Sequence, residues 1–139
     1  MAANKIILLP QVALTTTITN IYSPGTTTGG TGVPSTIANL AYIIRKVRVV
    51  NTTAAQIFVA LWKQVTIGAS PVAGKEVIWA GTATLLVLDA GKGATVPANG
   101  FLESVDILRL DASETDKFLV GGASATGLTI SAEAEITIA

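Results

Sequence analysis

The stretch LTISAEAEITI, residues 128–138, is the clearest indication of the fold. Leucine, isoleucine and alanine occupy every second position, and threonine, serine and glutamate occupy the positions between them. Successive side chains of a strand point to opposite faces, so this period of two predicts a long strand with one dry and one wet face. A helix would scatter the same apolar residues around its circumference.

Short β-prone segments recur upstream of this strand. The turn signal over residues 96–100 (VPANG) is strong, because proline fixes φ and Asn-Gly accepts a positive φ. The pair Ile43-Ile44 shifts the alternation of its segment, which predicts a bulge near Arg45. Short strands with turn signals every 8–12 residues or so are typical of an antiparallel sandwich or barrel. We expect further strands over residues 42–51, 56–63, 75–80, 84–89, 101–104, 106–110 and 117–120, and a possible one within 15–22.

The segment at residues 56–63 is apolar on both faces. Ile57, Val59 and Leu61 alternate with other apolar residues, which include Phe58 and Trp62. A strand of this kind is either sandwiched within its own domain or has one face against a partner.

The first part of the chain differs from the rest. Residues 23–35 (SPGTTTGGTGVPS) have no apolar period and no charge, which is typical of a flexible linker. We therefore expect residues 1–36 to form an extended N-terminal arm with its linker, and residues 37–139 to form the body. Apolar residues ahead of the linker are candidates for a partner interface: Ile6, Ile7, Leu8, Leu9, Val12 and Leu14.

Two placements of this apolar segment are open. It could pair as an edge strand of its own body. Alternatively, it could dock on a neighbouring subunit, by strand addition or in a groove.

Composition limits the classes of function. The 139 residues fit one domain. Nine basic and nine acidic residues cancel, so no charge bias favours nucleic acid or an anionic membrane. Only 13% of residues are charged, against about 25% in typical soluble domains. We infer that another protein covers part of the surface; solvation by threonine and serine is the alternative.

Histidine and cysteine are both absent from the sequence. The chain therefore lacks a ready near-neutral general base, a soft metal ligand and a thiolate nucleophile. We expect a protein that is not an enzyme, with no catalytic residues, no cofactor, no metal site and no small-molecule substrate.

Two acidic groups bear on this expectation. Glu133 and Glu135 lie two positions apart on a strand, about 7 Å between Cα atoms, which is a spacing that glycosidase carboxylates use. However, an exposed strand face does not raise the pKa of an acid, so we interpret it as solvated. Residues 111–116 (DASETD) resemble half of a calcium loop but lack its glycine and distal glutamate, and we expect a hairpin loop.

Two basic segments are equally weak signals. Residues 91–93 (GKG) are too short for a phosphate-binding loop. Arg45, Lys46 and Arg48 form a basic cluster without aromatic platforms, which favours a solvated or salt-bridged face over nucleic-acid binding.

From about residue 42 to the end, the chain resembles a group of small all-β bacteriophage virion proteins. The resembling phrases are IRKVRVVNT at residues 44–52 with Ala54-Ala55, VPANGF at 96–101, ILRLDA at 107–112 and the closing strand. The resemblance implies a jelly-roll-like sandwich and a structural role, as a decoration or cement protein of the capsid or as part of the tail or fibre. It implies no catalytic residues.

Together these observations predict an all-β, antiparallel β-sandwich that is homotrimeric and located in the virion. Its expected partners are the major capsid protein and copies of itself, and not nucleic acid or membrane. A tail or fibre component is the first alternative. A carbohydrate-binding module that stacks sugars on Trp62 or Trp79 is the second, although aromatic residues within apolar strands are more often core anchors.

Overall fold

The computed structural model describes residues 5–24, 27, 29–33, 40–64, 77–81, 83–84, 87–89, 91–113 and 118–138. Within these residues the chain forms twelve strands and no helix. The strands are β1 (Lys5–Ala13), β2 (Thr19–Tyr22), β3 (Leu40–Asn51), β4 (Ile57–Gln64), β5 (Val77–Trp79), β6 (Ala83–Thr84), β7 (Val87–Leu88), β8 (Ala94–Val96), β9 (Phe101–Ser104), β10 (Leu108–Asp111), β11 (Phe118–Ala123) and β12 (Leu128–Ile138).

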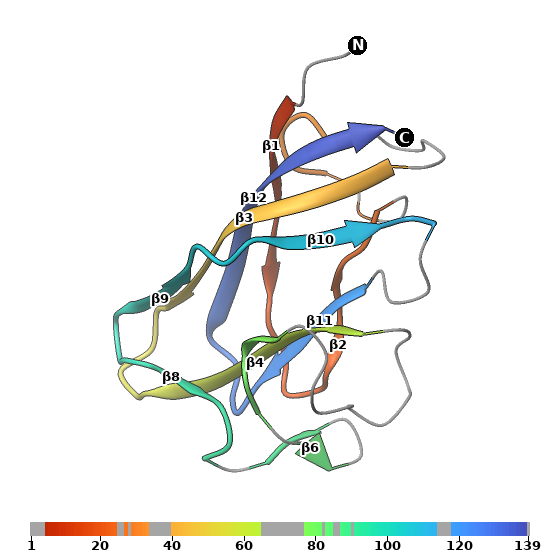
Figure 1. Ribbon diagram of the computed structural model, residues 1–139. Coiled ribbons are helices and arrows are strands. Elements are labelled where there is room, and N and C mark those ends of the chain that lie inside the picture. The colour runs from red at the N-terminus through yellow and green to blue at the C-terminus, as the bar shows by residue number, and fades with distance from the viewer. Residues whose placement is uncertain are drawn as a thin grey trace.

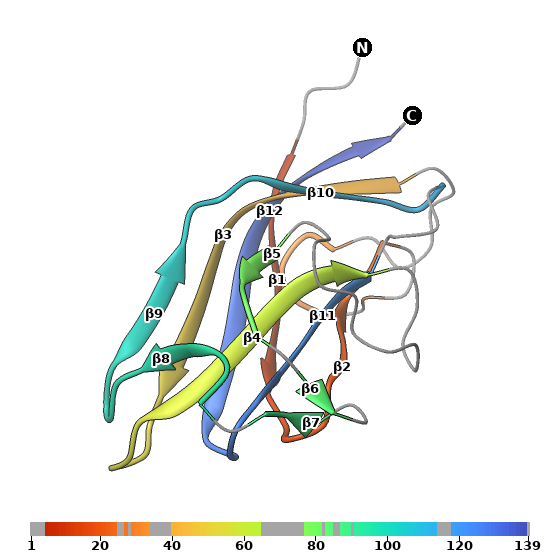
Figure 2. The same ribbon diagram turned by 60° about the horizontal axis from the view of Figure 1, so that its bottom comes forward.

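The strands form two five-stranded antiparallel sheets with one hydrophobic core between them (Figure 1). The first sheet has the order β1-β12-β3-β10, and β9 also pairs with β3. The second sheet has the order β2-β11-β4-β5, and β8 also pairs with β4. The short hairpin β6-β7 lies beside the second sheet (Figure 2). The expected all-β, antiparallel class is confirmed, and the arrangement is sandwich-like.

The closing strand has the predicted bounds and the predicted two faces. Leu128, Ile130 and Ala134 of β12 are buried in the core, whereas Glu133 and Glu135 lie on the opposite, partly solvated face. β12 pairs along its whole length with β3. These are the two longest strands, and they form the centre of the first sheet.

The bulge predicted near Arg45 is confirmed. Glu133 of β12 is opposite Lys46 of β3, but the next residue, Ala134, is opposite Ile44. Arg45 is therefore the additional residue of β3 and has no partner position on β12. This insertion keeps Ile44 and Val47 both inside the core although they are three positions apart.

Strand β4 is covered on both faces by residues of the same chain. Ile57, Val59 and Leu61 face the main core. On the other face, Trp62 belongs to a second buried cluster with Ile18, Ala60, Leu88 and Val120. Of the two explanations for its apolar faces, the structure supports a strand sandwiched within its own domain.

The expected N-terminal arm is not confirmed, and of the two placements left open for its apolar segment the described residues show an edge strand of its own body. Lys5–Ala13 form β1, which is hydrogen-bonded in the antiparallel direction to β12 at the edge of the first sheet. Beyond it, Leu8 exchanges two backbone hydrogen bonds with Thr31, at 3.0 and 2.9 Å. Residues 29–33, part of the expected linker, are thus held against β1. The expected boundary between residues 36 and 37 lies outside the described residues.

Two further elements differ in detail from expectation. The segment at 84–89 forms parts of two short strands, β6 and β7, and not one strand. β11 continues through Gly121 and Gly122 to Ala123. Glycine is needed at both positions because a Cβ there would lie 2.6 to 2.8 Å from its neighbours. The 96–100 turn is confirmed: Asn99 has a φ of 53°, and the Gly100 N–H donates to the Pro97 carbonyl at 3.0 Å.

Candidate interaction surface

The outer face of the first sheet gathers the polar and charged residues that the sequence distributes over three strands. The pairing register places Leu8 of β1 opposite Glu133 of β12, and Glu133 opposite Lys46 of β3. One row across the sheet therefore carries an apolar, an acidic and a basic side chain. The next such row on this face pairs Ser131 with Arg48.

Ion pairs and one cation–π contact engage the basic cluster of β3. The Arg45 guanidinium lies 2.7 Å from a carboxylate oxygen of Glu135, and the Lys46 ammonium lies 3.6 Å from Glu103. Arg48 is stacked 4.3 Å from the centroid of the Phe101 ring. Partly exposed pairs of this kind contribute about 0–1 kcal/mol each, so they orient the side chains more than they stabilise the fold. The salt-bridged interpretation of this cluster fits the geometry for Arg45 and Lys46.

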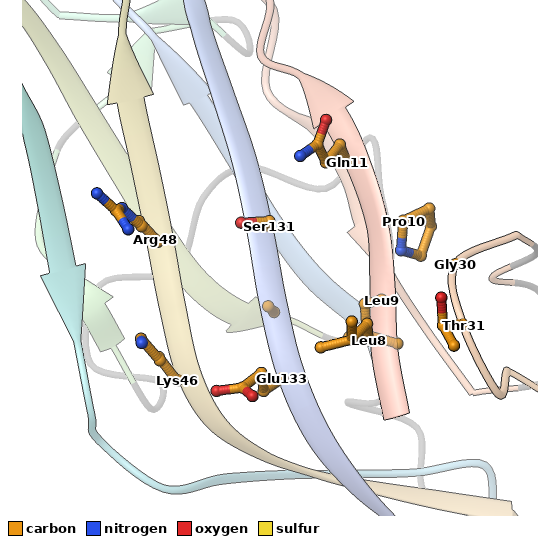
Figure 3. A pocket seen from close by; sticks show the side chains of 11 residues that line it. Leu8, Leu9, Pro10, Gln11, Gly30, Thr31, Lys46, Arg48, Ser131 and Glu133 are labelled. Atoms are coloured by element: carbon orange, nitrogen blue, oxygen red, sulfur yellow. The ribbon is translucent and has the colours of Figure 1, made fainter. Parts of the chain in front are cut away.

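A hollow of about 590 Å³ lies on this face between β1, β12 and β3 (Figure 3). The register of β1 against β12 shifts between Leu9 and Val12, at an irregularity that contains Pro10 and Gln11. The hollow lies at this irregularity. Its lining consists of Leu8, Leu9, Pro10, Gln11, Gly30, Thr31, Lys46, Arg48, Ser131, Ala132 and Glu133. Such a mixture of apolar, amide, hydroxyl and charged groups suits non-covalent contact with a protein surface.

Apolar side chains are exposed at both edges of the first sheet. On β1, Ile6 and Leu8 are 52% and 47% exposed. At the opposite edge, Val105 and Ile107 are 71% and 73% exposed, in the connector between β9 and β10. Phe101 of β9 is also exposed, although Arg48 covers part of its ring.

The six N-terminal interface candidates fall on two faces, because Ile6 to Leu9 alternate and the register of β1 then shifts before Val12. Ile7, Leu9 and Leu14 are buried in the core of their own body, and Val12 packs partly buried against it. Ile6 and Leu8 point to the outer face and are available to a partner while β1 stays in place.

A tyrosine of the second sheet ties this edge strand to the body. The Tyr22 hydroxyl of β2 donates a hydrogen bond of 2.6 Å to the Pro10 carbonyl of β1. Burial raises the pKa of Tyr22 well above its usual range, so the hydroxyl remains a donor throughout the neutral range.

Sequence reasoning missed Val105 and Ile107 as surface residues. The signal was present, because they share the parity of Arg109, whereas Leu108 and Leu110 have the opposite parity and are buried. The strand expected over residues 106–110 is observed as β10, which begins only at Leu108.

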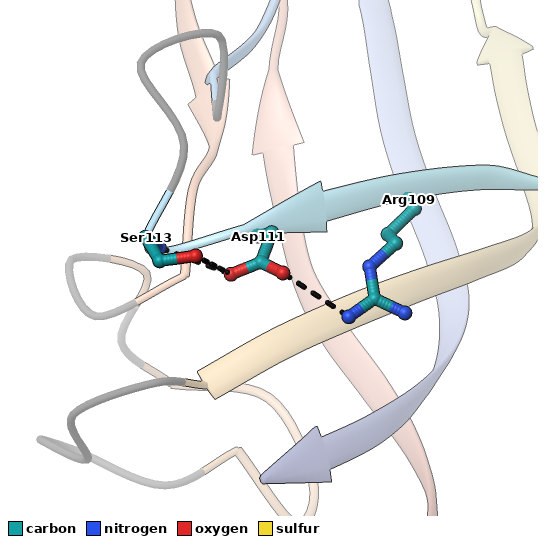
Figure 4. Close-up of polar contacts among 3 residues, drawn as sticks. All are labelled: Arg109, Asp111 and Ser113. Carbon is teal, nitrogen blue, oxygen red and sulfur yellow. Dashed lines mark hydrogen bonds and ion pairs between the residues drawn. The ribbon is translucent and has the colours of Figure 1, made fainter. Parts of the chain in front are cut away.

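The acidic motif at residues 111–116 forms a turn where it is described (Figure 4). One Asp111 carboxylate oxygen accepts hydrogen bonds from the Ser113 N–H and hydroxyl, at 3.0 and 2.8 Å. The other oxygen lies 3.1 Å from the Arg109 guanidinium. These contacts, the Ser113 backbone first, lower the pKa of Asp111. Residues 114–116 lie outside the described part. Among the described residues there is no group of histidine, cysteine or acidic side chains that could hold a metal ion.

The remaining motifs also have structural placements. Trp62 and Trp79 are only 4% and 8% exposed, so neither offers the open ring face that sugar stacking requires. In the 91–93 segment, the Lys92 N–H donates to the Asp89 carbonyl at 3.0 Å, which closes a turn before β8. No helix within the described ranges is long and apolar enough to cross a membrane.

Comparison with protein-family models, with curated proteins and with solved structures gave no match for this chain.

Proposed function

We propose that this chain is a structural virion protein that decorates or cements a phage capsid. In this proposal the sandwich is of the jelly-roll-like kind, the protein is a homotrimer, and the major capsid protein is its main partner. Its work is mechanical: it holds neighbouring shell subunits together by many non-covalent contacts.

The observation that carries the proposal is the exposure of large apolar side chains at both edges of one sheet. Ile6 and Leu8 lie at one edge, and Val105 and Ile107 lie at the other. Exposed apolar groups that cluster at defined places mark interaction surfaces, whereas isolated ones need no explanation. In a chain with only 13% charged residues, cover of these edges by another protein would remove apolar surface from water.

Multivalency makes such a surface sufficient for stable attachment. A specific interface buries about 1,600 Å² in total. When a trimer binds a shell, the second and third contacts form at a high effective concentration, so each individual contact can be modest. No reactive group is required for this role.

The copy number of the chain in purified particles tests the proposal. Quantitative mass spectrometry should be applied to virions produced by the genome that encodes this chain. We expect a fixed, high ratio of this chain to the major shell protein. Absence of the chain from the particle would refute a virion role.

A tail or fibre component is the second candidate, because the same exposed edges would serve an assembly at one vertex. In that case the chain would be present in few copies per particle. The ratio to the shell protein therefore separates the two structural roles in one measurement.

A further inference from the structure

We propose that the hollow between β1, β12 and β3 binds an extended segment of another protein, and that this segment carries an acidic and a basic side chain two positions apart. The acidic side chain binds Arg48, and the basic side chain binds Glu133. This inference rests on the proposed function in one respect, because it takes the segment to belong to a neighbouring virion protein. It adds the place of the contact and the chemistry that the partner presents.

The first argument is the arrangement of the side chains around the hollow (Figure 3). Two rows of the outer face cross it. In one row, Glu133 of β12 lies between Leu8 of β1 and Lys46 of β3. In the next row, Ser131 of β12 lies opposite Arg48 of β3. Arg48 and Glu133 are therefore diagonal neighbours of an antiparallel pair, which are about 7–8 Å apart.

The second argument is that one cation of the hollow lacks an acidic partner. Lys46 is paired with Glu103, at 3.6 Å. The Arg48 guanidinium is stacked on the Phe101 ring, and within the described residues no carboxylate forms an ion pair with it. Stacking uses the face of the guanidinium plane, so the N–H groups at its edge stay available. A carboxylate can accept two hydrogen bonds from such an edge.

The third argument is that an unpaired group of opposite charge lies in the neighbouring row. Glu133 is partly exposed, and in the part of the chain that the structure describes no cation is paired with its carboxylate. Arg48 does not fill this role, because Phe101 lies in β9, on the other side of β3 from β12, and the stacking turns the guanidinium that way. The hollow thus presents one cation and one anion to a ligand.

The spacing of these two charges selects the ligand. In an extended chain, side chains two positions apart point to the same face and are about 7 Å apart. An acidic and a basic side chain at this spacing can therefore reach Arg48 and Glu133 at the same time. In a free amino acid, the ammonium and the carboxylate are attached to one carbon atom, which is too close for both contacts. Opposite charges placed in this way give an interface its specificity.

Other groups of the hollow suit the backbone of such a segment. The Gln11 amide and the Ser131 hydroxyl line it, and neither side chain forms a hydrogen bond with any residue that the structure describes. Both can donate to and accept from a peptide group. The N–H and the carbonyl of Leu8 are already bonded to Thr31. The segment therefore lies on the face of the sheet and does not extend the sheet beside Leu8.

Titration of the whole, isotope-labelled chain with short peptides tests the site. The probe is acetyl-Ser-Asp-Ala-Lys-Ser-amide, and the readout is the shift of the backbone amide resonances. We expect saturable shifts at Leu8, Arg48 and Ser131, with a Kd on the order of 1 mM. Two control peptides replace Asp-Ala-Lys by Asp-Ala-Asp or by Lys-Ala-Lys. Each control brings one like charge to the hollow, so it should bind about tenfold more weakly.

Substitutions in the hollow provide a second measurement. Arg48→Gln and Glu133→Gln should each weaken binding of the Asp-Ala-Lys peptide about fivefold. Arg109→Gln is the matched control, because it removes an exposed guanidinium of the same sheet outside the hollow, and it should leave the Kd unchanged. Glu133→Lys should reverse the preference, so that the Asp-Ala-Asp peptide binds more tightly than the Asp-Ala-Lys peptide. Matching thermal unfolding curves would show that the variants keep the fold.

Three outcomes would overturn the inference. The first is equal binding of the three peptides, or binding that Arg48→Gln does not weaken. The second is binding of galacturonic acid at the same amides as tightly as the peptide, which would assign the hollow to acidic sugars. The third is a shift of these amides when the protein concentration is raised without peptide, which would show that a second copy fills the hollow.

The copy number in virions decides the proposed function separately, because the titration needs no particle. A chain that binds the peptide but is absent from particles would keep the site and lose the virion role. A chain that is abundant in particles but does not bind the peptide would keep the role and lose the site.

Discussion

At the scale of single residues, Asn51 shows how a buried polar group can fix a turn. Its side chain is 1% exposed. Its amide donates to the carbonyls of Ala55 and Val96, at 2.9 and 3.2 Å. Its carbonyl oxygen accepts from the N–H and the hydroxyl of Thr53, at 2.9 and 2.7 Å. One side chain thus joins the turn after β3 to the end of β8.

Replacing Asn51 should therefore be costly. Asn51→Ala removes the side-chain donor to the buried Val96 carbonyl and the acceptor of the Thr53 N–H and hydroxyl, and we expect it to lower the free energy of unfolding by about 2–4 kcal/mol. Thr52→Ala, at the exposed neighbouring position, is the matched control and should change it by less than about 0.5 kcal/mol. Urea unfolding measures both. Equal effects of the two substitutions would contradict the role of the Asn51 network.

Asp111 should contribute to the acid sensitivity of the fold. Its pKa is lowered in the folded state by Ser113 and Arg109. A depressed folded-state pKa gives stability that is complete above the unfolded-state pKa, about 4, and is lost as the pH falls through the folded-state value. Asp111→Asn should therefore flatten the loss of stability as the pH falls below about 4. Ser113→Ala, which keeps the carboxyl but removes a hydroxyl donor, should give an intermediate slope. Unfolding at several pH values measures this, and parallel curves for all three proteins would refute it.

At the scale of elements, the sequence was sufficient for strands with strict alternation and insufficient for β1. β12 and the bulge at Arg45 were predictable because each depends on local parity along one strand. The run Ile6-Ile7-Leu8-Leu9 has no alternation, so the sequence does not indicate which face is inward. Its partner β12 is at the other end of the chain, and pairing at such a distance leaves no local signal. The surface was predictable only in part for the same reason, because Ile6 and Leu8 became distinguishable from Ile7 and Leu9 once the pairing was known.

The loop that covers the edge of β1 depends on Gly30. Its φ is +72°, and a Cβ there would lie 2.1 Å from the Leu8 carbonyl oxygen. Gly91 has nearly the same φ, +71°, but a Cβ there would meet nothing within 4 Å. Substitution of these two glycines therefore distinguishes the cost of a positive φ from the cost of a steric clash.

We therefore expect different losses from two identical substitutions. Gly91→Ala should lower the free energy of unfolding by about 1 kcal/mol, the cost of a positive φ. Gly30→Ala adds a clash with the backbone of β1 and should cost about 3 kcal/mol. It should also speed amide hydrogen exchange at Leu8 and Thr31, because the loop moves away from the edge. Equal losses in both variants would mean that the loop does not depend on this close approach.

At the scale of the whole molecule, one face of β1 packs in the core, and the other face is exposed and available to the proposed assembly. Its inner residues fill the core beside β12, and its outer residues extend the apolar edge of the first sheet. Deletion of the N-terminal strand would therefore remove core and surface together. A loss of shell binding in such a truncation could not be assigned to the surface alone.

Adjacent substitutions on β1 separate the two roles. Ile7→Ala removes a side chain that is 1% exposed, and we expect the free energy of unfolding to fall by about 3 kcal/mol. The residual folded protein should still associate, because the exposed side chains of Ile6 and Leu8 on the outer face of β1 are unchanged. Ile6→Ala, one position away and on the outer face, should change the stability of the monomer by less than about 0.5 kcal/mol but weaken self-association. Thermal unfolding of dilute protein and light scattering across a concentration series measure the two effects. Because alternation places the two side chains on opposite faces of one strand, Ile7→Ala should lower mainly the stability and Ile6→Ala should weaken mainly the association. Loss of stability in Ile6→Ala equal to that in Ile7→Ala would show that β1 is not held in this register.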